Sequence, residues 1–239
     1  SGLGTVSNTL SLLSTSEYLA MRREAYTNDG INPLPSNAYD VNGTWNESSN
    51  TDWQKTLFGK TSYLTIGQGS ISGGNGHTQF LVSGNYHKQT GVFPGYHHND
   101  KISTLANLSH KTKNDRLSLQ LTAIHTSNQN NLPSDGLIVS KAISLAPNAP
   151  QLYNDDGSLN WEGTTWTNPL AGLKKTYESN GTTLVANARL GYNIFKNLIL
   201  TANLGYTENQ LRELRTDPST AFNPAYGIGP KSSTAIHNT

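Results

Sequence analysis

Residues 184–206 contain the feature that most constrains the fold of this chain. Apolar and polar side chains alternate there along two arms of about ten residues each, joined by Phe195-Lys196-Asn197. A period of two residues is the pattern of a β-strand with one apolar and one polar face, and the short joint predicts a hairpin. Each arm is long enough to cross a bilayer when it is tilted. The apolar positions are Ala186, Ala188, Leu190, Tyr192, Ile194, Leu198, Leu200, Ala202, Leu204 and Tyr206.

Two further hairpins precede this one. Residues 105–109 face 117–123, and residues 64–72 face 78–86. The pattern is weaker in the earliest arm, where Ile71 is out of phase with the preceding apolar positions. The three hairpins together predict an antiparallel, all-β chain.

One helix is expected before the strands. Ser14 and Glu17 form a capping box, and good helix formers follow from Leu19 to Ala25. Asn28-Asp29-Gly30 ends the helix, and an ordered loop continues to Trp53.

The connections between strands differ sharply in length. Turns within hairpins are short, whereas residues 88–101 and 127–182 are predicted to form long loops. Short turns at one end and long loops at the other are typical of outer-membrane barrels. A soluble β-sandwich that uses the same apolar faces as its core also fits this periodicity.

Composition excludes several classes of protein. The 17 Lys and Arg nearly balance the 16 Asp and Glu, so no overall charge attracts nucleic acid. The absence of Cys excludes disulfides and thiolate chemistry. No apolar run of about 18 residues is present, so no transmembrane helix is predicted.

Three short motifs are interpreted as turns or loop tips rather than sites. Gly73-Gly74-Asn75-Gly76 lacks the Lys-Ser/Thr of a phosphate loop and predicts a turn with positive φ. Asn154-Asp155-Asp156-Gly157 lacks the Glu of a calcium loop. His97-His98 with Asp100 has no ligand at helical spacing. Since no catalytic spacing occurs either, we expect no enzymatic activity, metal or cofactor.

Five aromatic residues in the predicted loops are candidates for binding a ligand. Flat rings next to Asn, Asp and Thr suit stacking on sugars, with hydrogen bonds around the rim. The alternative is that these rings pack the loops together. The candidates are Trp45, Trp53, Tyr153, Trp161 and Trp166.

Short sequence motifs, in order over nearly the whole chain, resemble the SusC-like TonB-dependent outer-membrane transporters. They are Glu17-Tyr18-Leu19, Met21-Arg22-Arg23-Glu24-Ala25, Thr51-Asp52-Trp53-Gln54, Ser70-Ile71-Ser72-Gly73-Gly74, Thr78-Gln79-Phe80, Asn130-Asn131-Leu132-Pro133-Ser134, Ala146-Pro147-Asn148-Ala149-Pro150, Tyr153 to Trp161, and Trp166-Thr167-Asn168-Pro169-Leu170.

The resemblance implies an antiparallel transmembrane β-barrel segment with long extracellular loops and one short loop helix. Such transporters place a plug inside a 22-stranded barrel, so the plug and the remaining barrel are expected outside these residues. The implied organisation is a helix-containing extracellular loop over 1–61, two hairpins over 62–126, a long extracellular loop over 127–182, a hairpin over 183–207, and the start of the next extracellular loop over 208–239.

The resemblance also implies a function and a location. The chain would be part of a transporter in the bacterial outer membrane that imports oligosaccharide with a SusD-like surface lipoprotein. The TonB system would drive it through the plug. Leu190, Tyr192, Leu200, Leu204 and Tyr206 would face lipid, and Asn187, Arg189, Asn193, Thr201 and Asn203 would face the lumen or the plug. The alternatives are a secreted carbohydrate-binding β-sandwich and a glycoside hydrolase fragment.

Overall fold

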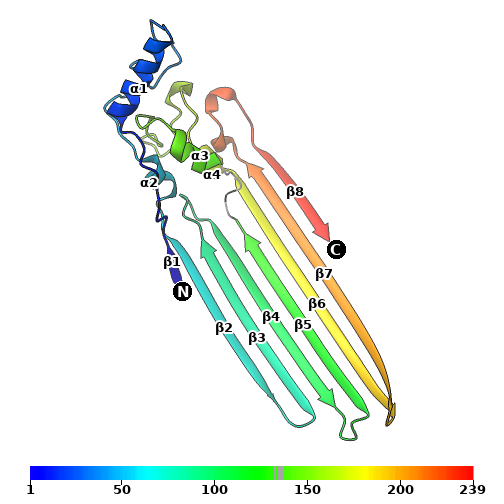
Figure 1. Ribbon diagram of the computed structural model, residues 1–239. Helices are drawn as coiled ribbons and strands as arrows, with labels where there is room; N and C mark the ends of the chain where they lie inside the picture. Colours follow the sequence, from blue (N-terminus) through cyan, green and yellow to red (C-terminus); the bar gives the residue numbers. More distant parts are fainter. Residues whose placement is uncertain (132, 134–136, 239) are drawn as a thin grey trace.

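The computed structural model describes residues 1–131, 133 and 137–238. Leu132 and Ser134, which belong to the sequence motif Asn130-Asn131-Leu132-Pro133-Ser134, lie outside the described residues. All the described strands belong to one antiparallel sheet of eight strands, in which neighbours in sequence are neighbours in space (Figure 1). The strands are β1 (Gly2–Gly4), β2 (Ser62–Gly74), β3 (Thr78–Thr90), β4 (His98–Lys111), β5 (Leu117–Asn130), β6 (Thr176–Phe195), β7 (Leu198–Asp217) and β8 (Lys231–Asn238).

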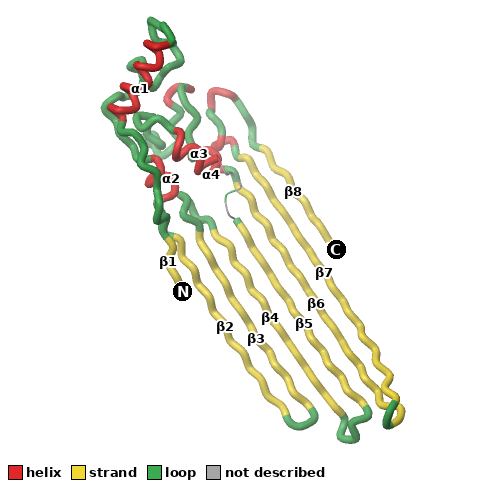
Figure 2. Tube along the Cα trace, viewed as in Figure 1, coloured by secondary structure: helices red, strands yellow, loops and turns green. Residues whose placement is uncertain are grey.

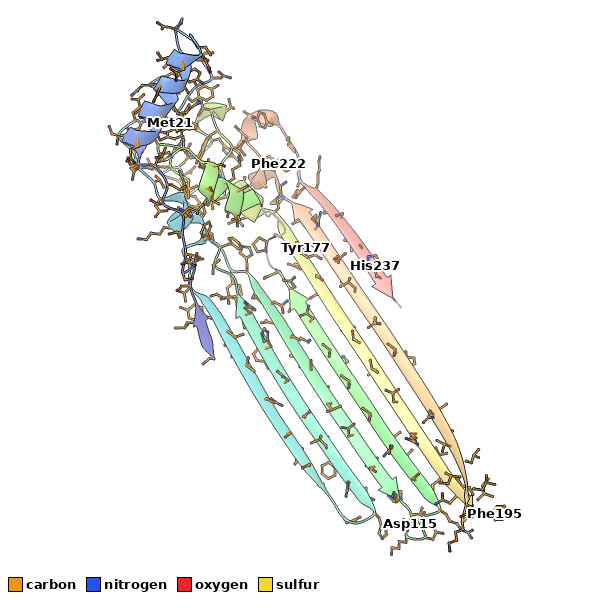
Figure 3. All side chains as sticks on the ribbon, viewed as in Figure 1. Met21, Asp115, Tyr177, Phe195, Phe222 and His237 are labelled. Carbon is orange, nitrogen blue, oxygen red and sulfur yellow. The ribbon has the colours of Figure 1, made fainter. Side chains whose placement is uncertain are left out.

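The short and long connections lie at opposite ends of the sheet. Residues 75–77, 112–116 and 196–197 form tight turns at one end, while every helix lies at the other (Figure 2). We call these ends the turn end and the loop end. Asp115 and Phe195 mark the first, and Tyr177 and Phe222 lie near the second (Figure 3). The helical elements are α1 (Thr15–Asn28), α2 (Trp53–Phe58), α3 (Leu137–Ser144), α4 (Ala171–Lys174), η1 (Glu162–Thr164), η2 (Ser219–Ala221) and η3 (Pro224–Tyr226).

The strand register separates the side chains into two faces. One row of directly paired residues is apolar on six consecutive strands: Ile71, Val82, Ala106, Ala123, Ala186 and Tyr206. We call the side that carries this row the apolar face and the other side the polar face. The apolar face holds the odd-numbered residues of β2 and β5 and the even-numbered residues of β3, β4, β6, β7 and β8.

The apolar face of the strands is uncovered. Leu200 and Leu204 remain 62% and 71% exposed, and the ribbon shows one layer of strands (Figure 1). A β-sandwich would bury these residues against a second sheet, and the described residues form no second sheet. The sandwich alternative is therefore wrong. Among the helices of the described chain, none has the length and apolarity to span a bilayer.

The predicted hairpins and the helix are present, but several predicted boundaries are wrong. Strands β6 and β7 contain 20 residues each, instead of the shorter arms predicted over 183–207. The segment 208–239, expected to begin a loop, contains the end of β7 and all of β8. The loop expected over 88–101 shortens to 91–97. These strand ends are mostly polar on both faces. Backbone pairing continues there although the alternation of hydrophobicity has stopped, so the sequence pattern does not mark their length.

The phase of the earliest arm also needs correction. Ile71 pairs with Val82 on the apolar face, whereas Leu64 and Ile66 lie on the polar face. Helix α1 agrees with its sequence signals. The Ser14 side chain accepts a hydrogen bond from the backbone N–H of Glu17, and the Glu17 carboxylate accepts one from the backbone N–H of Ser14.

A substitution in the β2–β3 turn tests this fold. Gly74 has a φ of +144°, and a Cβ there would lie 2.1 Å from the carbonyl oxygen of Thr78. We expect Gly74→Ala to cost about 1–3 kcal/mol of stability, because the strained backbone and the clash must both be accommodated. Gly76→Ala is the control, since a Cβ there has no heavy atom within 4 Å. Thermal unfolding of the two variants measures the difference, and equal midpoints would contradict this turn geometry.

Candidate functional site

The loops at the loop end share one hydrophobic core. Its residues come from α2, from α3, and from the segment before β6, so connections far apart in sequence pack together. Val92 and Phe93 of the β3–β4 loop pack against the same core. We call this assembly the loop layer. Its buried residues are Trp53, Leu57, Phe58, Ile138, Ala142, Ala149, Leu159, Trp166, Leu170 and Ala171.

Hydrogen bonds join the two longest connections within the loop layer. The backbone N–H of Thr51 donates to the Pro147 carbonyl at 2.8 Å. The indole N–H of Trp53 donates to the Ala146 carbonyl at 2.8 Å. The buried amide of Asn148 donates to the backbone carbonyl of Asp40, also at 2.8 Å. Because an unpaired buried polar group destabilises the folded protein, these bonds hold one connection against the other.

The structure brings four of the five candidate aromatic residues together. Trp53 and Trp166 are only 3% and 8% exposed, with ring centroids 6.1 Å apart. Trp45 lies with its centroid 6.5 Å from that of Trp166, and Trp161 packs against the same core. Tyr153 lies apart from them and is 47% exposed.

For Trp53 and Trp166 this arrangement fits the alternative that the rings pack the loops together. Trp53 and Trp166 are core residues. Their indole N–H groups donate hydrogen bonds to the backbone carbonyls of Ala146 and Asn160, respectively. Trp45 also donates its N–H within the layer, to the Thr165 hydroxyl at 2.9 Å. Stacking on a sugar needs an open ring face, which the two buried rings do not have.

A charged network holds α1 against the following loop. Arg22 Nε and the Tyr18 hydroxyl both donate to Oδ2 of Asp40, each at 2.8 Å. Beside them lies a small core of Leu19, Ala38 and Val41. Burial of the Asp40 carboxyl raises its pKa, but the hydrogen bonds from Arg22 and Tyr18 outweigh burial and hold that pKa below its ordinary value. Burial, with the hydrogen bond to Asp40, raises the pKa of Tyr18 to about 12.

The residues predicted to face the lumen share the polar face. Arg189 lies between Gln120 and Asn203 in one register row, and Gly191 separates Ser118 from Thr201 in another. Asn193 lies on the same face at the turn end, where its amide donates to the Asp115 carbonyl at 2.6 Å. Asn187, Arg189, Asn193, Thr201 and Asn203 therefore point to one side of β6 and β7.

The alternation of hydrophobicity in the sequence does not reveal the polar residues nearer the loop end. Side chains from four strands line a hollow on the polar face, and only Ile66 among them is a large apolar residue. Their alternation is hard to detect because the opposite face is also partly polar there. The lining residues are Ile66, Asn85, His87, Asn99, Lys101, Ser103, Thr126 and Asn128.

The three motifs interpreted as turns or loop tips have little in common with metal sites. The described part of the chain contains no group of three or more His, Cys, Asp and Glu residues suited to a metal. His97 contacts the carbonyls of Pro94 and Asn131, whereas His98 lies 3.5 Å from Asp100. Gly157 has a φ of +80° and Asp156 accepts from Ser158, as expected for a turn.

Removing the buried indole of Trp53 tests the structural role of the loop layer. We expect Trp53→Ala to cost about 3–5 kcal/mol, because a large ring leaves the core and the Ala146 carbonyl loses its donor. Tyr153→Ala, the exposed control, should change stability little. Hydrogen exchange of the loop-layer amides measures both variants. Faster exchange in the Tyr153 variant than in the Trp53 variant would contradict this assignment.

The Asp40 network predicts a pH dependence. Because the folded pKa of Asp40 is lowered, its stabilisation is complete above the unfolded pKa of about 4 and is lost as the pH falls further. Asp40→Asn should cost about 1–3 kcal/mol at neutral pH and remove this acid loss. Glu47→Gln, which breaks the more exposed pair with Arg23, is the control. Local unfolding followed by tyrosine fluorescence against pH distinguishes the two, and an unchanged acid profile in Asp40→Asn refutes the prediction.

Comparisons with known proteins agree with the fold. No family model matches the chain. TonB-dependent receptor P3 of Formosa agariphila is 25% identical over 245 residues, covering 98% of this chain and 23% of the receptor. The chain thus spans about a quarter of the length of that relative.

Solved structures match at lower identity. The RagAB peptide transporter gives a TM-score of 0.65 at 17% identity, covering 90% of this chain and 28% of the matched chain. The RagAB peptide importer in the closed-closed state gives 0.67 at 18%, with the same coverage. The chain is thus similar in sequence to a TonB-dependent receptor, and its open antiparallel sheet has the fold of part of the RagAB transporter barrel.

Proposed function

We propose that this chain is the early barrel segment of an outer-membrane transporter that imports nutrient oligosaccharide with a SusD-like surface lipoprotein. The observation that carries this proposal is an oblique apolar band on the apolar face. On β7 the band runs from Leu198 to Tyr206, and on β3 it runs from Phe80 to Tyr86.

The slope of the band matches tilted membrane strands. The register row of Phe80 meets β7 at Leu204, and that of Tyr86 meets β7 at Gln210. Between β7 and β3 there are four strand spacings. Over that distance the edge of the band nearer the turn end shifts by six residues, from the level of Leu198 to that of Leu204. The edge nearer the loop end shifts by four, from the level of Tyr206 to that of Gln210. At about 3.3 Å per residue and about 4.8 Å per strand, the slope is about 35–45°. Transmembrane barrel strands tilt by about the same angle, which levels such a band with the membrane plane.

The apolar band supports assigning the polar face to the lumen. If the band faces lipid, the polar side chains of the same strands face inward, because alternate residues of a strand point to opposite faces. We assign Asn187, Arg189, Thr201 and Asn203 to the lumen wall, with Asn193 bound to the adjacent turn.

The ends of the sheet suggest its orientation and its missing partners. The short turns suit the periplasmic side and the loop layer the extracellular side, as in other barrels. β2 pairs with β1 only at Ser62–Leu64, so most of its outer edge is open in the described residues. Unpaired edges cost several kcal/mol per group in lipid, so further barrel strands must close them. A plug within them would couple transport to the TonB system.

The assignment of partner and cargo rests on less direct support. The matched structures are described as a RagAB peptide transporter, which supports a lipoprotein partner for this chain. For the cargo, the amides and hydroxyls that line two hollows on the polar face favour a polar, hydrogen-bonding molecule such as an oligosaccharide.

Matched substitutions on the two faces of β7 test this proposal. Leu200→Arg should cost about 2–4 kcal/mol and reduce the amount of folded protein, because a charge near the midplane would face lipid. Asn203→Arg should assemble nearly normally, because its side chain would face water. The amounts of full-length protein in the outer-membrane fraction measure both variants. Equal losses, or absence of the unsubstituted protein from that fraction, would refute the proposal.

A further inference from the structure

The turn end of the sheet carries an excess of positive charge. Its three tight turns contain Lys113, Arg116 and Lys196, but Asp115 is the only carboxylate among these described residues. The whole chain, in contrast, has 17 Lys and Arg against 16 Asp and Glu. Positive charge is therefore concentrated at this end of the strands. We call Lys113, Arg116 and Lys196 the basic rim.

Hydrogen bonds join the three turns to one another. The backbone N–H of Lys111 donates to the His77 carbonyl at 2.7 Å, which ties the β2–β3 turn to the end of β4. The backbone N–H of Asn193 donates to the Arg116 carbonyl at 2.8 Å, and its side-chain amide donates to the Asp115 carbonyl at 2.6 Å. The cations of the basic rim therefore share one surface.

The cations of the basic rim have no anionic partner within the described residues. All three side chains are exposed, and no ion pair of the described chain includes them or Asp115. The β4–β5 turn lies between the other two turns, and neither of these contains Asp or Glu. The two cations of the β4–β5 turn thus have neighbours on both sides that offer no carboxylate.

Position distinguishes the basic rim from the cations of the polar face. Lys111 and Arg189 are strand residues on that face, so their surroundings depend on what fills the barrel. Lys113, Arg116 and Lys196 lie in turns that project past the strands. A plug inside the barrel would not enclose residues that lie beyond the ends of its wall.

The basic rim lies at the turn-end edge of the apolar band. Arg116 directly precedes Leu117, the first apolar-face residue of β5, and Lys196 lies two residues before Leu198. A register shift in β6 pairs Phe195 with Leu198, so the Phe195 ring, which is 71% exposed, belongs to the same face. Positive and apolar side chains therefore meet at this edge.

Strand geometry gives the depth of these cations. The backbone N–H of Thr112, which precedes Lys113, donates to the Leu117 carbonyl at 2.9 Å, so this turn closes at the edge of the band. At about 3.3 Å per residue, all three cations lie within about 7 Å of the band. The polar layer on each side of a bilayer is about 5–8 Å thick. In the orientation proposed above, the basic rim lies at headgroup depth on the periplasmic side.

We propose that the basic rim binds the phosphate groups of anionic phospholipids in the membrane leaflet at the turn end. This inference rests on the proposed function, because it requires the sheet to span a membrane. Guanidinium and ammonium groups bind phosphate through charge-assisted hydrogen bonds. Each basic residue near an anionic lipid surface strengthens binding about fivefold. Phe195 and Leu198, next to Lys196, contact the acyl chains of the same lipid.

The size of the turns favours a lipid over an acidic protein. The turns contain two to five residues, so they do not extend beyond the headgroup layer. An acidic protein segment would have to enter that layer to reach the cations. A phospholipid is already at this depth, and it supplies both a phosphate for Lys196 and an acyl chain for Phe195.

Lipids that differ only in headgroup test the proposal on the full-length transporter in detergent. Native mass spectrometry compares dioleoyl phosphatidylglycerol with dioleoyl phosphatidylcholine at matched ionic strength. We expect phosphatidylglycerol to bind at least about tenfold more tightly, because it carries the net negative charge that phosphatidylcholine lacks. This preference should shrink as salt is added, since screening weakens exposed charge pairs.

Variants connect the preference to the basic rim. Lys113→Gln, Arg116→Gln and Lys196→Gln should each weaken phosphatidylglycerol binding about fivefold and leave phosphatidylcholine binding unchanged. Lys196→Arg keeps the charge and should keep the preference. The triple Gln variant should bind the two lipids nearly equally.

A matched control removes the same number of charges from the opposite end. Three exposed lysines of the loop end, which form no ion pair in the described chain, are changed together, and the preference for phosphatidylglycerol should remain. The control changes are Lys55→Gln, Lys60→Gln and Lys174→Gln. Variants are compared where their outer-membrane levels match those of the unsubstituted protein.

Three results would overturn the inference. These are equal binding of the two lipids by the unsubstituted protein, a preference that survives the loss of all three rim cations, and an equal loss in the loop-end control. A poly-glutamate peptide that displaces phosphatidylglycerol from the rim would identify an acidic protein as the partner instead. Each outcome leaves the proposed function intact if the protein still fractionates with the outer membrane. Absence from that membrane contradicts the proposed function itself.

Discussion

The strand register is the constraint on which the rest of this structure depends. In an antiparallel sheet, a shift of one residue moves every side chain of a strand to the opposite face. The row from Ile71 to Tyr206 stays apolar across six strands, and its sequence neighbours Asn107, Thr122 and Asn187 all lie on the other side. One register thus produces both the apolar band and the polar face.

The two parts of the molecule use hydrophobic residues in opposite ways. The sheet displays them outward, as Leu200 and Leu204 show, and has no core of its own. The loop layer buries them, with Leu57 and Ala142 completely inaccessible. A sheet of this kind suits an apolar solvent, whereas the loop layer follows the rule for water. Hydrophobic residues are thus exposed on the sheet and buried in the loop layer at its end. This difference supports the proposal that the chain crosses a membrane boundary.

The loop layer also gives the loop end a defined shape. Two connections separated by four strands share one core and exchange buried hydrogen bonds through Trp53 and Asn148. The α1 network of Arg22, Tyr18 and Asp40 orders a second, smaller unit beside them. In the proposed transporter, cargo would meet an ordered surface at the mouth before it entered the barrel.

The sequence by itself determined the features that depend on near neighbours. Alternation placed Asn187, Arg189, Thr201 and Asn203 on one face, and the Ser14–Glu17 capping box located α1, because both signals lie within a few residues. It could not find the polar ends of β6 and β7 or the strand β8, since pairing there leaves no hydrophobic period. Only the tertiary structure decided that Trp53 and Trp166 are core residues, because their burial depends on partners supplied by distant connections.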